Sequence, residues 1–140
     1  MMKLHILKVI PFLFIFFLLY NSCEMVQEVP YYSDKNNYII LNGIVDYIRY
    51  SDDGKTLYLR FSDLDPDFSD CPFKIVGKNL KIAQKNGIDE KMEIGDEVEF
   101  ITAPRYFGDG YIVPIAGISV DGEVLLDFEQ GYENYIDWIG

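Results

Sequence analysis

Residues 38–61 read YIILNGIVDYIRYSDDGKTLYLRF, and this stretch carries the strongest indication of the fold class. Its last part alternates between apolar and more polar residues, with Leu57, Leu59 and Phe61 on one parity. This is typical of a strand that has one face exposed to solvent. Its first part is rich in β-branched and aromatic residues, and Gly43 within it predicts a bulge or a strong bend. An Asp-Gly turn joins the two parts. The stretch therefore predicts a hairpin of two long strands.

Shorter elements are expected on the C-terminal side of this hairpin. Gly87 is expected to end a helix of about two turns in the manner of a helix C-cap. Pro114 predicts that part of its strand lies at a sheet edge. The expected order is an acidic loop (62–71), a short strand (73–76), a helix (78–86), a strand ending at residue 102, a loop (104–110), two strands (111–120 and 123–128) and a docked amphipathic helix (132–139).

This order of elements resembles the OB-fold, a five-stranded Greek-key barrel with a helix between its third and fourth strands. The resemblance covers residues 38–128, and the stretch IGDEVEF (94–100) is similar to the approach to strand four in many members. It implies a mainly β chain, with a small five-stranded barrel and one or two short helices after an N-terminal signal helix. A plain β-sandwich or another small barrel is the alternative. OB-folds serve many functions, so the fold alone implies no activity.

The N-terminus has the build of a secretory signal. Lys3 and Lys8 supply positive charge, and residues 9–20 are apolar apart from Pro11. A helix of that length measures about 18 Å, well short of the roughly 30 Å hydrocarbon core of a bilayer. A signal peptide is therefore favoured over a spanning helix.

The end of this segment, Tyr20-Asn21-Ser22-Cys23, resembles the lipobox of bacterial lipoproteins, although Tyr20 and Asn21 depart from its usual residues. The resemblance implies a signal peptide (1–22), acylation of Cys23, a lipid-anchored tether (23–37) and an OB-fold-like domain (38–140). It places the protein at the cell membrane, anchored by lipid on the extracytoplasmic side. An uncleaved anchor remains open, as does cleavage elsewhere, which would leave Cys23 able to pair with Cys71.

Charge and histidine content exclude several functions. The chain has 12 basic and 23 acidic residues, a net charge of −11, and a chain without residues 1–22 would carry 10 basic and 23 acidic residues, or −13. The only histidine, His5, lies in the signal segment, so Ser–His or Cys–His catalysis and histidine metal ligands are not expected. We therefore expect no enzyme and no cofactor. The acidic balance predicts no nucleic-acid partner.

The acidic loop is a candidate metal site. Asp63, Asp65 and Asp67 match the first three ligand positions of a calcium loop, with Asp70 nearby, but Phe68 stands where glycine is needed. An EF-hand is thereby excluded, and a weak calcium site is the functional interpretation. A solvated loop with Asx turns is the favoured alternative.

A second candidate is the loop before the strand at 111–120. Aromatic rings with an adjacent arginine and aspartate suit a sugar or a peptide. The alternative is that these rings fold back over the barrel mouth. The predicted ligand-binding residues are Arg105, Tyr106, Phe107, Asp109 and Tyr111.

A third candidate lies on the first hairpin, where Tyr47, Tyr50 and Tyr58 accompany Arg49 and Arg60. OB-folds bind ligands on a sheet face of this composition. Whether these side chains share a face depends on the register, and a partly buried cross-strand ladder is favoured.

The sequence thus predicts a non-catalytic, lipid-anchored binding module for an envelope protein or a glycan. A structural or adaptor lipoprotein without a ligand, and a weak calcium-binding surface protein, are the alternatives.

Overall fold

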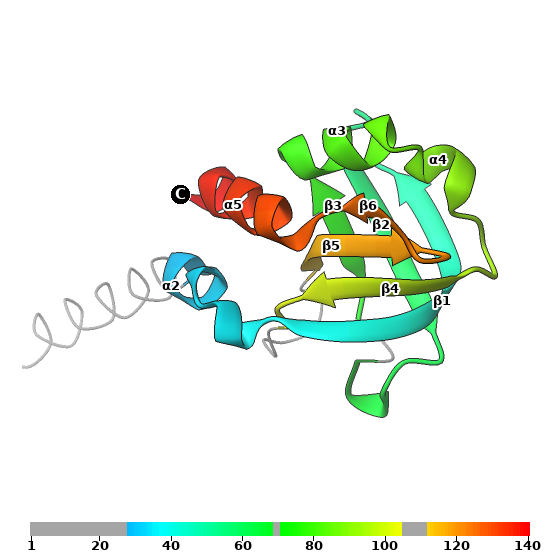
Figure 1. Ribbon diagram of the computed structural model, residues 1–140, viewed down its shortest axis with the longest axis horizontal. Coiled ribbons are helices and arrows are strands. Elements are labelled where there is room, and N and C mark those ends of the chain that lie inside the picture. Colours follow the sequence, from blue (N-terminus) through cyan, green and yellow to red (C-terminus); the bar gives the residue numbers. More distant parts are fainter. Residues whose placement is uncertain (1–27, 69–70, 105–111) are drawn as a thin grey trace, which may run out of the picture.

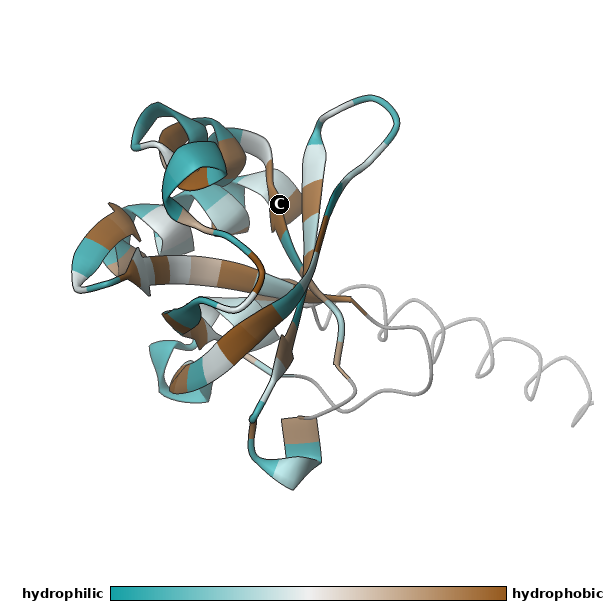
Figure 2. Ribbon diagram, turned by 90° about the vertical axis from the view of Figure 1, so that its right-hand side faces the viewer, coloured by the Kyte–Doolittle hydropathy of each residue, from teal (hydrophilic) through white to brown (hydrophobic). Residues whose placement is uncertain are grey.

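The computed structural model describes residues 28–68, 71–104 and 112–140, which form a small barrel with helices packed against it (Figure 1). Buried and more exposed residues alternate along β2 and β4, whereas β5 is apolar along most of its length. Figure 2 shows the hydropathy of each residue along the ribbon. In chain order the elements are α2 (Glu28–Ser33), η1 (Lys35–Asn37), β1 (Ile39–Tyr50), β2 (Thr56–Ser62), η2 (Pro66–Phe68), β3 (Phe73–Val76), α3 (Gly77–Lys85), α4 (Ile88–Lys91), β4 (Glu97–Thr102), β5 (Val113–Val120), β6 (Glu123–Leu126) and α5 (Phe128–Ile139).

The sheet closes on itself. Its strand order is β3-β2-β1-β4-β5-β6, and an additional parallel pairing of β3 with β5 joins the two sides. Five strands therefore form a closed barrel, and β6 adds a sixth strand beside β5. With α3 between β3 and β4, this confirms the expected mainly β, OB-fold-like architecture.

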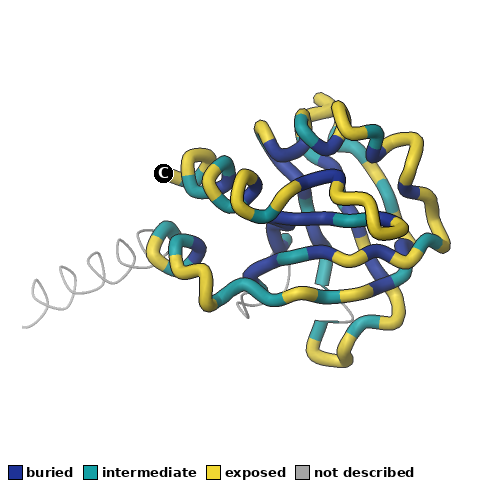
Figure 3. Tube along the Cα trace, in the orientation of Figure 1, coloured by how far each residue is buried: buried dark blue, intermediate teal, exposed yellow. Residues whose placement is uncertain are grey.

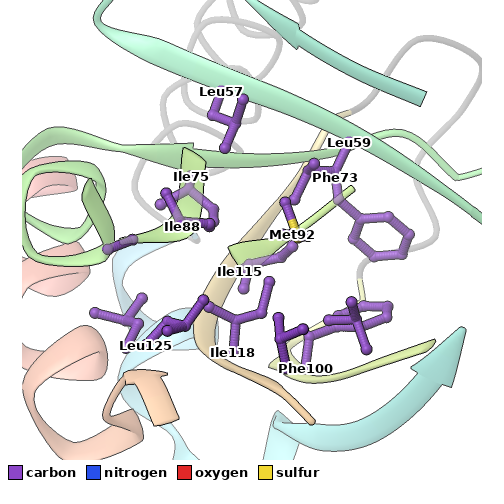
Figure 4. Close-up of a cluster of buried hydrophobic side chains, with 14 of the residues drawn as sticks. Leu57, Leu59, Phe73, Ile75, Ile88, Met92, Phe100, Ile115, Ile118 and Leu125 are labelled. Atoms are coloured by element: carbon purple, nitrogen blue, oxygen red, sulfur yellow. The ribbon is translucent and has the colours of Figure 1, made fainter. Parts of the chain in front are cut away.

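The barrel interior is filled by the inward parity of each strand. Leu57, Leu59 and Phe61 are at most 2% exposed, as their alternation predicted. Phe61 stacks on Phe100 with ring centroids 4.3 Å apart, and Phe73 meets Phe100 edge-on at 4.9 Å. Aromatic pairs of this kind contribute about 0.5–1.5 kcal/mol beyond the area that they bury. Figure 4 shows Leu59, Phe73 and Phe100 converging from three different strands.

The irregularity in β1 is not at Gly43, where the sequence predicted it. The pairing with β2 shifts between Val45 and Tyr47, so Asp46 is the extra residue of a bulge. Gly43 is instead a point of close approach, because a Cβ there would lie 2.7 Å from the Cβ of Phe61. The glycine is needed for packing and the bulge for bending the strand.

Pro114 does not mark a sheet edge, contrary to the sequence prediction. It pairs with Lys74 at the short parallel seam that closes the barrel, and β5 lies between β4 and β6. Its carbonyl accepts a 2.6 Å hydrogen bond from the hydroxyl of Thr102. A proline fits here because its missing N–H is not required where only two residues of β3 and β5 pair.

Residues 28–37, which the sequence analysis assigned to the tether, form α2 and η1 and pack on α5 (Figure 1). Tyr32 is fully buried, and its ring meets that of Tyr135 edge-on at 5.1 Å. The hydroxyl of Tyr132 donates to the carbonyl oxygen of Ser33 at 2.5 Å. This part of the predicted tether is therefore folded onto the C-terminal helix.

Helix α5 lies directly on β5, which is buried along almost its whole length (Figure 3). Gly131 makes this close approach of the helix to the strand possible, because a Cβ there would lie 1.8 Å from the carbonyl oxygen of Ala116. The buried Asn79 of α3 donates to the carbonyl oxygen of Gly131 at 2.9 Å. Near the end of α5, the ring of Trp138 lies over Gly77. These contacts fix α3 and α5 to each other and to the barrel.

Candidate functional site

Two of the predicted sites lie outside the described residues. These are the acylation site Cys23 and the aromatic loop with Arg105, Tyr106, Phe107, Asp109 and Tyr111. Among the described residues, no helix has the length and apolar character that crossing a membrane requires.

The acidic loop is partly described. Asp65 accepts a 3.0 Å hydrogen bond from the N–H of Asp67, which is an Asx turn, and Asp63 has a φ of 60°. Asp70 lies outside the described residues. Within the described ranges, no three His, Cys, Asp or Glu side chains are grouped so that they could hold a metal ion.

The third candidate of the sequence analysis is brought together on the outer surface of β1, β2 and β3. Tyr47 pairs with Arg60, Arg49 pairs with Tyr58, and Tyr58 pairs in turn with Lys74. Neighbours in adjacent strands lie about 5 Å apart, and diagonal neighbours about 7–8 Å. Tyrosine and arginine therefore alternate both along and across the strands, a pattern that we call the chequerboard. Lys74 extends the row of Arg49 and Tyr58. We call these five residues the basic-aromatic face.

The parity of each strand explains why these side chains point outward. Leu57, Leu59 and Phe61 fill the core, which leaves Tyr58 and Arg60 on the outside. In β3 the buried Phe73 and Ile75 likewise place Lys74 outside. Lys74 was not among the residues predicted for this site, although the same alternation, apolar at 73 and 75, could have identified it.

The three cations of this face are open to solvent and to a ligand. Arg49 and Arg60 are exposed, and Lys74 is half-buried. The ion pairs found among the described residues are Lys35–Glu129 and Lys91–Glu123, and neither involves this face. The positive charge of the face is therefore not neutralised by any described carboxylate.

A cleft of about 480 Å³ opens into the basic-aromatic face. Tyr47, Tyr58 and Arg60 supply its polar groups, and its other walls are apolar. The remaining lining residues are Leu59, Pro72 and Ile112. Flat apolar groups can enter such a cleft while anionic groups remain at the arginines.

Tyr50 does not belong to this face. It lies on the other parity, packs against the core, and donates a hydrogen bond to Asp89. Burial, followed by this hydrogen bond, raises the pKa of the Tyr50 phenol above its usual value of 10.0. Tyr50 therefore stays protonated and plays a structural part.

The other half of the barrel wall carries the opposite charge. A row of paired residues crosses four strands there, with Asn42, Glu99, Ser119 and Val124 in register. A second cleft, of about 430 Å³, is lined by Asn42, Glu97, Glu99, Ser119, Asp121, Gly122 and Val124. We call its polar lining residues, Asn42, Glu97, Glu99, Ser119 and Asp121, the acidic face. Its lining contains no cation.

Searches for related proteins found no family model and no curated protein that matches the chain. Among solved structures, the chain is similar to Rim1, a mitochondrial single-stranded DNA-binding protein from S. cerevisiae. The identity is 15% and the TM-score 0.38, and the match covers 60% of this chain and 94% of that chain.

The functional prediction from sequence is corrected. It excluded nucleic acid as a partner, and expected an envelope protein or a glycan instead, on the net charge of the whole chain. The physical reason for the error lies in the charge argument. A net charge of −11 is an average over the chain, and the register gathers Arg49, Arg60 and Lys74 on one face. The exclusion of nucleic acid is therefore withdrawn, and with it the predicted envelope or glycan module.

Proposed function

We propose that this protein binds single-stranded nucleic acid, without catalysis, on the basic-aromatic face. The observation that carries the proposal is the chequerboard of Tyr47, Arg49, Tyr58 and Arg60, with Lys74 beside it and no described carboxylate paired to its cations. Aromatic rings stack on the faces of bases, and arginine and lysine side chains neutralise phosphates.

The contributions are large enough for binding. A tyrosine that stacks on a base contributes about 1–3 kcal/mol, whichever base it meets. Each neutralised phosphate also releases condensed counterions, which makes the affinity depend on salt. Two rings and three cations therefore predict a sequence-tolerant, salt-sensitive site.

Charge reversal on the face tests the proposal. In filter-binding assays with oligothymidylate, we expect Arg49→Glu combined with Arg60→Glu to abolish binding by the full-length protein in detergent. Tyr58→Ala should weaken binding by about 1–3 kcal/mol. The matched control is Lys78→Glu combined with Lys81→Glu, which changes the net charge equally at exposed positions of α3.

The proposal is wrong if the wild-type protein fails to retain oligothymidylate at low salt. It is equally wrong if the α3 control loses as much affinity as the Arg49 and Arg60 variant. Circular dichroism spectra of all variants should match that of the wild type, because the substituted side chains lie outside the core.

We infer further that residues 1–22 are a lipoprotein signal and that Cys23 carries the lipid, so that the face is presented outside the cytoplasm. The support is the basic start, the short apolar run and the sequence YNSC. The intact mass of protein extracted from its native membrane tests this. A mass of residues 23–140 plus acyl chains is expected, and an unmodified chain of 140 residues would contradict it.

A further inference from the structure

The barrel wall is divided by charge into two halves. Around the closed barrel the strands follow one another as β3, β2, β1, β4 and β5. The basic-aromatic face covers β3, β2 and the second half of β1, and the acidic face covers the first half of β1, β4, β5 and the turn that follows β5. The bulge at Asp46 separates the two halves of β1.

Carboxylates also lie beyond the end of β2, where Ser62 pairs with Ile44 in the first half of β1. Two residues after Arg60 the chain leaves β2 and enters the acidic loop, with Asp63, Asp65 and Asp67 all exposed. At about 0.15 M ionic strength charges are screened beyond about 8 Å, so a bound phosphate senses only the patch on which it lies. A strand that continued past the bulge at Asp46 or past the end of β2 would place its phosphates among carboxylates.

We infer that the ligand is a short single-stranded segment that crosses only the basic-aromatic face and does not wrap the barrel. The inference rests on the proposed function and specifies its ligand. Arg49, Arg60 and Lys74 neutralise three phosphates, and the rings of Tyr47 and Tyr58 take unstacked bases. A footprint of about four nucleotides follows, at the low end of the range for OB-folds.

The division by charge also selects single strands over duplex. Tyr47 and Tyr58 can stack only on bases whose faces are free, and in a duplex those faces are covered by neighbouring base pairs. A duplex would in addition bring its second phosphate backbone over a flanking acidic segment. A hairpin duplex of the same length should therefore compete at least about tenfold less well than the single strand.

Salt dependence and oligomer length test the inference with the full-length protein in detergent. For single strands the logarithm of affinity falls with the logarithm of salt by about 0.7 per neutralised phosphate, so three cations predict a slope of about −2. Over oligothymidylates of about 3 to 24 nucleotides, affinity should rise up to about four nucleotides. Beyond that length it should increase only with the number of available positions.

A variant that reverses the charge of the acidic face provides a second test of the short footprint. Glu97→Lys combined with Glu99→Lys turns the adjacent wall basic, so the slope should steepen to about −3.5 and the footprint should lengthen. The control, Glu90→Lys combined with Glu93→Lys, changes the net charge equally at exposed positions of the α4 segment and should keep a slope of about −2.

The outcomes separate the two proposals. A wild-type slope steeper than about −4, or affinity that keeps climbing steeply to the longest oligomer, overturns the short footprint but leaves single-strand binding intact. So does a Glu97 and Glu99 variant that behaves like its control. No binding at any length or salt ends the proposed function, and this inference with it.

Discussion

Gly131 is the residue at which helix α5 depends most directly on a missing side chain. In the interior of a helix, replacing glycine by alanine ordinarily stabilises by up to about 1 kcal/mol. Here the new Cβ would meet backbone, at 1.8 Å from the carbonyl oxygen of Ala116, so the helix must move off β5. We expect Gly131→Ala to lower the free energy of unfolding by about 3 kcal/mol, measured by urea denaturation.

The sign of this change is the informative quantity. Glu133→Ala, at an exposed position of the same helix, is the control and should change stability by less than about 0.5 kcal/mol. A stabilised Gly131→Ala protein would mean that α5 does not lie on β5 as described.

Tyr50 gives a pH dependence at the residue scale. Its pKa is raised in the folded protein, mainly by burial and then by its hydrogen bond to Asp89. An unfolded chain loses this proton near pH 10.0, whereas the folded chain retains it, so the stability is fully present below that pH and declines as pH rises above it. We expect Tyr50→Phe to lose less stability than the wild type between pH 9 and pH 11, as measured by urea denaturation. Equal losses would contradict the assignment.

Which side chains point out of the barrel was predictable only within regular strands. The alternation at 56–61 is enough by itself to place Tyr58 and Arg60 opposite Leu57, Leu59 and Phe61. The partners of Tyr47 and Arg49 were not predictable, because the bulge at Asp46 shifts the register by one residue. Half of the chequerboard could therefore be read from the sequence, and the other half required the pairing.

Among the elements, α2 owes its stability to contacts far away in the sequence. Tyr32 is fully buried against the C-terminal helix, whereas the neighbouring Lys35–Glu129 pair is exposed. We expect Tyr32→Ala to lower the free energy of unfolding by about 3–5 kcal/mol, because a large buried ring is lost. Lys35→Ala is the control, and its loss should stay below about 1 kcal/mol. Equal effects, measured by thermal and urea unfolding, would show that α2 is not docked.

Short elements held by tertiary packing were the ones that sequence reasoning missed. Helix α2 has six residues including Pro30, and α4 has four, so neither shows a helical period or enough length to be stable alone. Helix α5, by contrast, has a full amphipathic pattern and was expected, although it begins at Phe128, four residues before the predicted start. The carboxylate of Asp127 caps it by accepting a hydrogen bond from the N–H of Gln130.

At the scale of the whole molecule, a strongly negative protein carries the locally positive basic-aromatic face. At about 0.01 M salt the Debye length of about 30 Å lets an approaching polyanion sense the net charge of −11. At about 0.15 M it senses only the face within about 8 Å. We therefore expect the association rate with oligothymidylate, measured by surface plasmon resonance, to rise between these salt concentrations. A rate that falls over this range would indicate attraction by the whole molecule.

The fold class was predicted correctly from the sequence, whereas the net charge could not predict how charge is distributed over the surface. Element order depends on local patterns, which a sequence displays directly. The distribution of charge depends on which strands become neighbours, and Arg49 and Lys74 share a row only because β2 lies between their strands. The summed charge of the chain could not show this division.

The contact between Trp138 and Gly77 gives this protein a built-in optical signal. Trp138 is the sole tryptophan of the chain, and its indole rests on the first residue of α3. When the indole alone is excited, the fluorescence emission therefore reports on the contact between α3 and the end of α5. Because Trp138 is already 56% exposed, detachment of the C-terminal helix will shift this emission only modestly toward longer wavelengths, and the shift can be followed without attaching a dye.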